Sequence, residues 1–396
     1  MKWKEYSLDE LIHIKHGYAF KGEFFSEEPT DDILLTPGNF AIGGGFKVQK
    51  LKYYNGEFPV DYILDENDVI VTMTDLSKEA DILGFSAKVP AWYGKRFLHN
   101  QRIGLVKLKT DDFDKDYLYW LMRTFSYQRF VANGATGATV KHTSPTKICQ
   151  YKFTAPDDKT TQRKIASILS AYDDLIENNL KRIKLLEEKA FVSYKLLMNS
   201  EKLIEGKVGD LADVKSGYAF KSRDWSDEGF PVIKIKNIGN NDIDLIGCSF
   251  IPENIAEAAN KFKLNAGDLL IAMTGATVGK IGMMPKTETS FYLNQRVGIF
   301  KPKIQNAELF LFCFFNEPSA KNAVESLASG AAQPNISGSQ LESIKLFYPK
   351  FETVLEFGNS IKSHFQMIWN LKEQNTKLRE ARDILLHKLM NGQIEV

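Results

Sequence analysis

The stretch "GYAFKGEFF" at residues 17–25 returns as "GYAFKSRDW" at residues 217–225, and this repetition determines how the chain is organised. Three further pairs of segments recur in the same order: "NDVIVTMTDLS" (67–77) with "GDLLIAMTGAT" (267–277), "HNQRIGLVKLK" (99–109) with "LNQRVGIFKPK" (293–303), and "NGATGATVKHTSPTKI" (133–148) with "SGAAQPNISGSQLESI" (329–344). The last pair is matched at an offset of 196 residues. Four ordered matches indicate a tandem duplication, and two long copies predict two similar domains rather than a solenoid of short repeats.

The composition is that of an ordinary globular protein. The 396 residues are enough for two or more domains with their own cores, and 43% of them are hydrophobic while 26% are charged. The first residues lack the apolar run of a signal peptide, and nothing approaches the roughly 18 apolar residues of a membrane span. The three cysteines are scattered without a CxxC pair, which argues against a disulfide framework or a zinc site. We therefore expect a cytoplasmic protein with no membrane partner and no metal site.

Each copy ends in a long segment with the heptad pattern of a coiled coil. Residues 160–199 contain no Gly or Pro, and apolar residues recur there at steps of four and three. The same pattern returns 192 residues later, from Phe357 to Leu389. Such long helices need a partner to be stable, and the only equally long seam in the sequence belongs to the other copy.

An antiparallel pairing of these helices brings two seam asparagines together. If Asn179 faces Asn375, Ile165 meets Leu389 at one end and nearly every other layer is apolar. A buried asparagine pair fixes the register of a coiled coil at some cost in stability. The alternative is that each asparagine turns outward to water.

The predicted fold is α+β, because short β-rich runs and Gly, Asn and Asp loops precede a helical stretch in each copy. It consists of two similar domains joined by two long antiparallel helices that form a coiled coil, with a pseudo-twofold internal repeat. The predicted parts are a first domain at 1–156, a central helix at 157–205, a second domain at 206–349 and a C-terminal helix at 350–396.

Sequence signals for catalysis are absent. "GATVGKIG" (275–282) resembles a phosphate-binding loop, but it has three residues between Gly275 and Gly279 where four are needed. Ile281 also stands where Ser or Thr would bind magnesium. No adjacent prolines occur, so the Asn/Asp-Pro-Pro-aromatic motif of amino-methyltransferases is missing. The pattern favours a binding protein, with an enzyme whose site is not recognised as an alternative.

The second copy, followed by its long helix, resembles a specificity subunit of a type I restriction-modification system. The resemblance lies in the order "GYAFKS…PVIKIKNI…AGDLLIAMTGATVGKIG…LNQRVGIFKPK…ASGAAQPNISGSQLESIKLFYP". "TTQRKIASILSAYDDLIENN" and "LLHKLMNGQIEV" are similar to the spacer helices of that family. The first copy departs from the pattern at Asp75, where the second has Gly275, and at "GATVKHTSP", where the second has "AAQPNISGS".

The resemblance implies two target-recognition domains, each reading one half of a bipartite site on double-stranded DNA. The helices would set the spacing of the two halves and recruit two modification (methyltransferase) subunits. Those subunits would bind S-adenosylmethionine, and two restriction subunits that use ATP and magnesium can join them. This chain would then be a non-catalytic specificity subunit without a cofactor of its own. The alternative function is a coiled-coil protein-binding scaffold without DNA specificity.

Candidate DNA-binding residues are the donor and acceptor side chains of the loops, because Arg, Lys, Asn and Gln read base edges and loop amides reach phosphates. The first copy offers Thr36, Asn39, Lys47, Lys50, Thr74, Lys78, Lys141, His142 and Thr143. The second offers Lys236, Asn237, Asn240, Asn241, Thr274, Thr277, Lys280, Gln333 and Asn335. Arg102 and Arg296 stand in identical "NQR" segments, which favours framework or phosphate contacts over base discrimination. For each candidate the alternative is an ordinary solvated loop.

The charge of the two domains is close to neutral. Residues 1–156 carry 20 basic and 20 acidic side chains, and residues 206–350 carry 16 and 15. Phosphate neutralisation therefore predicts modest DNA affinity for the chain alone, with the methyltransferase partners supplying more of the binding.

Overall fold

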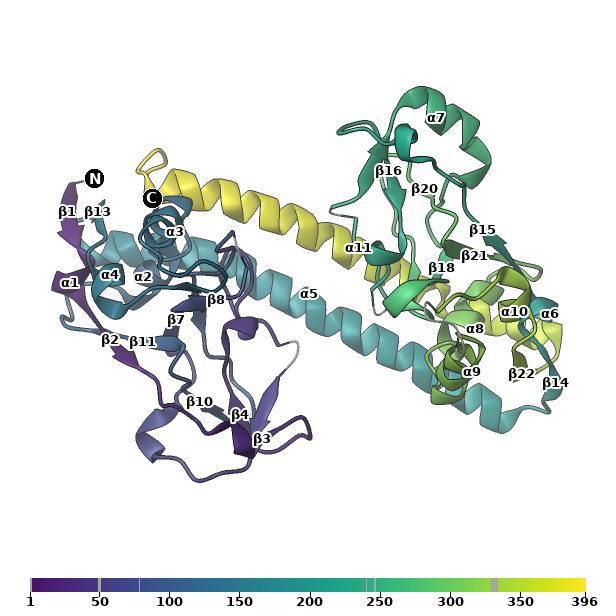
Figure 1. Cartoon of the computed structure of the whole chain (residues 1–396), viewed down its shortest axis with the longest axis horizontal. Helices are drawn as coiled ribbons and strands as arrows, with labels where there is room; N and C mark the ends of the chain where they lie inside the picture. The colour runs from purple at the N-terminus through teal and green to yellow at the C-terminus, as the bar shows by residue number, and fades with distance from the viewer. Residues whose placement is uncertain (1, 49–50, 78, 240, 246, 329–333) are drawn as a thin grey trace. The chain divides into compact units, whose positions relative to one another are not determined.

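The computed structural model describes the whole chain except residues 1, 49–50, 78, 240, 246 and 329–333 (Figure 1). It forms two compact units, which are Met1–Glu177 with Thr376–Val396, and Asn178–Asn375. Both boundaries fall inside the long helices α5 (Lys159–Ser200) and α11 (Phe351–Met390). Each unit therefore holds one mixed α+β domain together with part of each long helix.

The first unit is built on two sheets. Four antiparallel strands follow the order β2 (Ile12–His16), β11 (Ile103–Leu108), β7 (Val69–Thr72), β9 (Ser86–Lys88). A five-stranded sheet follows the order β3 (Phe25–Ser26), β5 (Lys52–Tyr54), β4 (Asp32–Leu34), β10 (Arg96–Leu98), β6 (Ile63–Leu64). Two short pairs complete it, β1 (Trp3–Ser7) with β13 (Lys152–Pro156) and β8 (Thr74–Asp75) with β12 (Lys141–His142). Its shorter helices are α1 (Leu8–Leu11), α2 (Lys115–Leu121), α3 (Phe125–Asn133) and α4 (Pro145–Cys149).

The second unit repeats this plan. Its four-stranded sheet follows the order β15 (Ala212–Ser216), β21 (Val297–Pro302), β18 (Leu269–Ala272), β19 (Ile281–Met283). A three-stranded sheet contains β17 (Ser249–Ile251), β16 (Phe230–Ile233) and β20 (Tyr292–Leu293), and β14 (Ile204–Lys207) pairs with β22 (Lys345–Tyr348). Its shorter helices are α6 (Val208–Leu211), α7 (Glu253–Ala258), α8 (Ala307–Phe314), α9 (Pro318–Ala328) and α10 (Gly338–Glu342). The shared sheet order confirms the tandem duplication.

The central strands explain why the repeated segments form sheets. All four residues of β7 and all four of β18 are buried, as continuous apolar runs predict for an interior strand. The parallel pairing of β4 with β10 in the first unit recurs as β16 with β20 in the second.

The two long helices pack in antiparallel fashion within each unit. In the first unit, Ile165 and Leu169 near the start of α5 share a buried cluster with Leu386 and Leu389 near the end of α11. In the second unit the ends are reversed. The α5 residues Ile183, Ala190 and Tyr194 lie in one cluster with the α11 residues Phe357, Ile361, Phe365, Ile368 and Leu371. The antiparallel coiled-coil prediction is thereby confirmed.

The predicted seam differs from the observed one in both units. In the first unit, Leu386 is buried where the heptad pattern predicted Leu385. In the second unit, Tyr194 is buried where the heptad pattern predicted Ser193, and Phe365 is buried where it predicted His364. Both aromatic rings pack against helix α8, Tyr194 on Phe310 with ring centroids 5.1 Å apart and Phe365 on Phe312 at 5.0 Å, so the domain core rather than the partner helix selects these positions.

The fourth pair of repeated segments is aligned differently from the prediction. Ser144 caps α4 and Ser337 caps α10, each accepting from a backbone N–H three residues on. These serines are 193 residues apart, as are the first residues of β13 and β22. The offset of 196 was therefore wrong, because small residues matched by composition while the capping serine and the following strand set the true register.

Candidate nucleic-acid interface

The repeated "GYAFK" and "NQR" segments form one unit of structure in each domain. The backbone N–H of Tyr18 donates to the carbonyl of His99 at 2.8 Å, and its carbonyl accepts from Gln101 N–H at 2.9 Å. In the second domain, Tyr218 makes the same two bonds with Leu293 and Gln295, at 2.8 and 2.9 Å. The repeated motifs are thus partners across the fold, each holding the other in place.

A glycine is required where these two segments cross. A Cβ atom at Gly17 would lie 2.0 Å from the carbonyl oxygen of Asn100, and one at Gly217 would lie 2.3 Å from that of Leu293. Any side chain at either glycine would therefore force the backbones apart. The close approach keeps the "NQR" turn rigid.

The turn presents an exposed arginine on a capped backbone. The Asn100 side chain accepts from Arg102 N–H at 3.0 Å, and the Asn294 side chain accepts from Arg296 N–H at 3.1 Å. Both asparagines are buried, whereas both arginines are exposed. This arrangement suits a phosphate contact that is common to both domains.

Each arginine belongs to a junction of three segments that are distant in sequence. In the first unit, Met73 N–H donates to the Arg102 carbonyl at 2.9 Å, and the Met73 carbonyl accepts from Thr143 N–H at 3.0 Å. In the second, Met273 makes the corresponding bonds with Arg296 and Ile336, at 3.0 and 2.9 Å. We call these two places the first and second strand-end junctions, since each lies where β7 or β18 ends.

The first strand-end junction is closed by the β8–β12 pair. Thr74 lies opposite His142, and the Thr74 hydroxyl and the His142 Nδ1 are hydrogen-bonded at 3.2 Å. The buried Asp75 carboxylate accepts from the N–H groups of Ser77 and Ile82, at 2.7 and 2.6 Å. The difference between the two copies at this position, Asp75 in the first and Gly275 in the second, therefore has a structural cause, because the Asp75 carboxylate holds the backbone of the loop that follows it.

At the second strand-end junction, the chain leaves β18 in a different turn from the one that follows the equivalent strand β7. Gly275 has a φ of +76°, which favours glycine, and its N–H donates to the Pro334 carbonyl at 3.0 Å. Thr274 forms a β-bridge with Asn335. The Thr277 hydroxyl donates to the Ile235 carbonyl at 3.4 Å. That contact brings the short helix η7 (Gly275–Thr277) beside η5 (Ile235–Asn237).

Two of the predicted DNA-binding asparagines are engaged inside the domains. Asn39 is fully buried, accepts from Thr36 N–H at 2.9 Å and donates to the Lys47 carbonyl at 3.3 Å. Asn237 does the same with Lys234 N–H and the Asp244 carbonyl, at 3.1 and 3.0 Å. The amides hold a turn together in both domains, which favours a structural role over a base contact.

The other predicted contacts divide by exposure. Seven are exposed, namely Lys47, Arg102, His142, Lys236, Lys280, Arg296 and Asn335. Six are half-buried, namely Thr36, Lys141, Thr143, Asn241, Thr274 and Thr277, and Thr74 is buried. Lys50, Lys78, Asn240 and Gln333 lie outside the described residues. The junctions bring together Thr74, Arg102, Lys141, His142 and Thr143 in the first unit, and Thr274, Thr277, Arg296 and Asn335 in the second.

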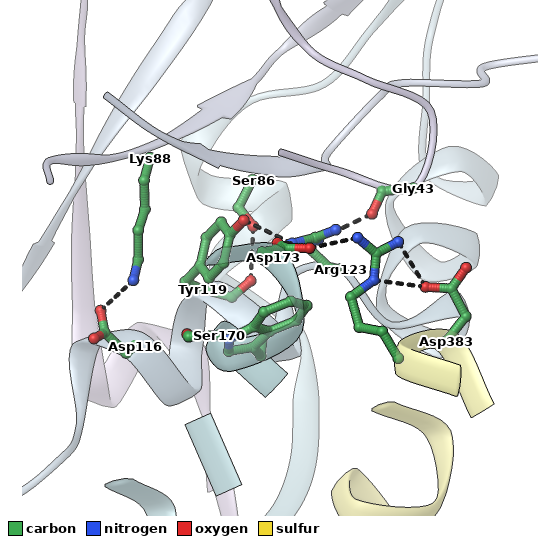
Figure 2. A network of polar contacts seen from close by, with 11 residues as sticks. Gly43, Ser86, Lys88, Asp116, Tyr119, Arg123, Ser170, Asp173 and Asp383 are labelled. Carbon is green, nitrogen blue, oxygen red and sulfur yellow. Dashed lines mark hydrogen bonds and ion pairs between the residues drawn. The ribbon is translucent and has the colours of Figure 1, made fainter. Parts of the chain in front are cut away.

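An ionic cluster of the buried Arg123 with the half-buried Asp173 and Arg382 joins the domain of the first unit to both long helices, and the sequence pattern did not reveal it (Figure 2). Asp173 of α5 accepts from Arg123 Nη1 at 2.6 Å and also from Arg382 of α11. Arg123 further donates to the Tyr119 hydroxyl at 2.7 Å and the Gly43 carbonyl at 3.0 Å. Burial would raise the pKa of Asp173, but the two guanidinium groups outweigh it and lower that pKa. Arg123 stands out in the sequence only as a charge within an apolar helical stretch.

Two features are absent from the described part of the structure. There, no group of three or more His, Cys, Asp or Glu side chains is arranged to hold a metal ion. Nor does any helix there combine the length and the apolar character needed to cross a bilayer.

Comparisons with known proteins agree with the repeated architecture. A family model described as "Type I restriction modification DNA specificity domain" matches residues 1–188 and again residues 201–378. The MjaVIII type I restriction enzyme specificity subunit of Methanocaldococcus jannaschii is 24% identical over 357 residues, covering 85% of this chain and 81% of that protein. The EcoBI specificity subunit of Escherichia coli is 21% identical over 428 residues, covering 99% and 86%.

A solved structure shows the same fold. The crystal structure of a type I restriction-modification S subunit from M. genitalium matches with a TM-score of 0.58 and 19% identity, covering 98% of this chain and 96% of that one. Two domain matches that together span nearly the whole chain establish its family. The protein belongs to the specificity subunits of type I restriction-modification systems, with two target-recognition domains.

Proposed function

We propose that this chain binds a bipartite site on double-stranded DNA, with each domain reading one half. The observation that carries the proposal is the repeated strand-end junction, in which the same backbone bonds to Met73 or Met273 join three segments that bear different side chains in the two domains. A common framework with variable side chains is what two readers of different sequences require, because the base edges are read by side-chain donors and acceptors. Arg102 and Arg296, identical in both, suit phosphate oxygens that look the same at every sequence.

The methyl transfer is assigned to partner subunits in this proposal. Two modification subunits would bring S-adenosylmethionine, and two restriction subunits with ATP and magnesium can join the complex. The chain itself would need no cofactor.

Exposed apolar side chains on the long helix α5 support the recruitment of a partner. In the first unit Ile168 and Leu175 are 37% and 51% exposed, seven residues apart on one face. In the second unit Leu185, Val192 and Leu196 are exposed at helical spacing. These side chains point away from the buried seam, so another helix can cover them.

A domain graft tests the function. Residues 206–349 would be exchanged for the corresponding segment of a relative, and the chain with its modification subunit would select duplexes from a randomised pool. We expect a bipartite consensus in which one half changes while the other stays as in the unaltered protein. If the unaltered complex selects no consensus, the chain is a scaffold without DNA specificity, and if both halves change, the domains are not independent readers.

A further inference from the structure

His142 and Asn335 occupy the same position in the two domains. Each immediately precedes the residue whose N–H donates to the methionine of its junction, Thr143 to Met73 and Ile336 to Met273. Each also pairs across with the equivalent threonine, Thr74 or Thr274. The two residues are 193 positions apart, the same offset as the helix-capping serines that follow them.

The backbone at this position is held on both sides. The His142 N–H and carbonyl exchange hydrogen bonds with Thr136, at 2.8 and 2.9 Å. Asn335 stands between Pro334, whose carbonyl accepts from Gly275, and Ile336, whose N–H donates to Met273. Both side chains are nevertheless exposed. Because the backbone is already fixed, binding has to order only the side chain, which suits a specific contact.

The two side chains present different hydrogen-bonding chemistry. The Asn335 amide offers one donor group and one acceptor side by side, which match N7 and N6 of adenine in the major groove. The Nδ1 of His142 is already hydrogen-bonded to the Thr74 hydroxyl, which leaves Nε2 for a single contact. One common position therefore offers a donor and an acceptor in the second domain and one ring nitrogen in the first.

We propose that His142 and Asn335 are the matched specificity-determining residues of the two domains, Asn335 reading an adenine and His142 a different base at the corresponding place of its half-site. This inference rests on the proposed function, since it requires that each domain reads DNA. It is independent of Arg102 and Arg296, which are identical in both domains and cannot distinguish the half-sites.

Exchanging the two residues tests the inference. The variants His142→Asn and Asn335→His would each be assembled with the modification subunit and used to select duplexes from a randomised pool. His142→Asn should shift one position of the first half-site towards adenine. Asn335→His should lower the adenine preference at one position of the second half-site on the order of tenfold, the usual discrimination of a bidentate contact. The other half-site should stay unchanged in each case.

The arginines provide a matched control. Arg102→Gln and Arg296→Gln should weaken binding to all sequences alike, reduce the slope of binding against salt by about one, and leave the consensus intact. The inference is overturned if both exchange variants keep the original consensus, if a change appears in both half-sites, or if the variants stay folded but bind no sequence. A lack of any consensus with the unaltered chain would instead contradict the proposed function.

Discussion

The side-chain amide of Asn179 donates a hydrogen bond to the side-chain carbonyl of Asn375 at 2.9 Å, and both residues are buried in the seam of the second unit. The contact predicted from the sequence is therefore present. On either side of it the seam returns to apolar residues, with Ile176 before and Ile183 after Asn179. A single polar layer between apolar layers favours one alignment of the helices, because any shift would leave both amides against hydrocarbon.

Replacing one of these asparagines should destabilise the protein more than replacing both. Asn179→Leu or Asn375→Leu leaves the other amide in an apolar layer and should lower the free energy of unfolding by about 1–3 kcal/mol. The double Leu variant should be at least as stable as the original chain, because the polar layer becomes apolar. Denaturant unfolding of the four proteins forms a double-mutant cycle, and a coupling energy near zero would contradict the contact.

The contribution of the Arg123–Asp173–Arg382 cluster to stability can be tested by replacing it with the apolar residues found at the equivalent positions of the second unit. Displaced by 192 residues, the equivalent positions of the second unit hold the buried residues Phe315, Phe365 and Ala190. Asp173→Ala should cost about 3–5 kcal/mol of stability, because it leaves the buried Arg123 guanidinium without its counter-ion.

The triple variant Arg123→Phe, Asp173→Phe, Arg382→Ala should recover most of that loss, since no buried charge remains. Thermal unfolding measures the difference. The exposed ion pair of Lys345 with Glu205 is the control, and Lys345→Ala should change stability by about 1 kcal/mol or less. A triple variant less stable than Asp173→Ala would show that the cluster is not replaceable by apolar packing.

Protonation of His99 in the unfolded chain should lower the stability of the protein in mild acid. Its ring is fully buried, its Nε2 is hydrogen-bonded to the Ile103 carbonyl at 2.8 Å, and burial lowers the pKa of His99 from 6.5 to about 4. The unfolded chain therefore takes up the proton first, and the contribution of His99 is complete above about pH 6.5 and lost as the pH falls towards 4. The loss should be on the order of 3 kcal/mol, since one pKa unit corresponds to about 1.4 kcal/mol.

The second domain supplies the control substitution for His99. Leu293, also buried, stands at the equivalent place in front of the second "NQR" segment. Unfolding of His99→Leu, followed between pH 4 and 7, should show a weaker dependence on pH than the original chain. Identical pH profiles would mean that His99 does not titrate on unfolding in this range.

The proposal that the helices set the spacing of the half-sites can be tested by lengthening them. Seven residues would be inserted between Asn179 and Leu180, and seven between Gln374 and Asn375. The insertions keep the heptad phase, keep the two asparagines opposite each other, and lengthen each helix by roughly 10 Å. The unspecified spacer in the selected DNA should grow by about three base pairs at 3.4 Å each, with both half-site sequences unchanged. Selection of the original spacer by a folded, complex-forming variant would exclude the helices as the ruler.

The sequence by itself was sufficient for the features that depend on local period and on repetition. The duplication, the α+β character of each copy and the two long helices all follow from spacing along the chain. The spacing also places Asn179 opposite Asn375, but the structure was needed to exclude asparagines turned outward to water. A heptad pattern fixes which face of a helix is buried, and a second pattern of equal length identifies its partner. These properties require no knowledge of how distant loops meet.

Tertiary structure alone decided the contents of the strand-end junctions and the ionic cluster. Asn39 and Asn237 have the residue type of base readers, yet each side chain is folded into a turn and donates to a backbone carbonyl, eight residues further on for Asn39 and seven for Asn237. His142 and Asn335 became equivalent only through the bonds that the next residues, Thr143 and Ile336, donate to Met73 and Met273, because small residues in the preceding loops align equally well by composition at a wrong offset. The hydrogen bonds of the junctions and of the ionic cluster join segments that lie between 23 residues (Met273 with Arg296) and 209 residues (Asp173 with Arg382) apart, and a local pattern carries no record of which segments those are.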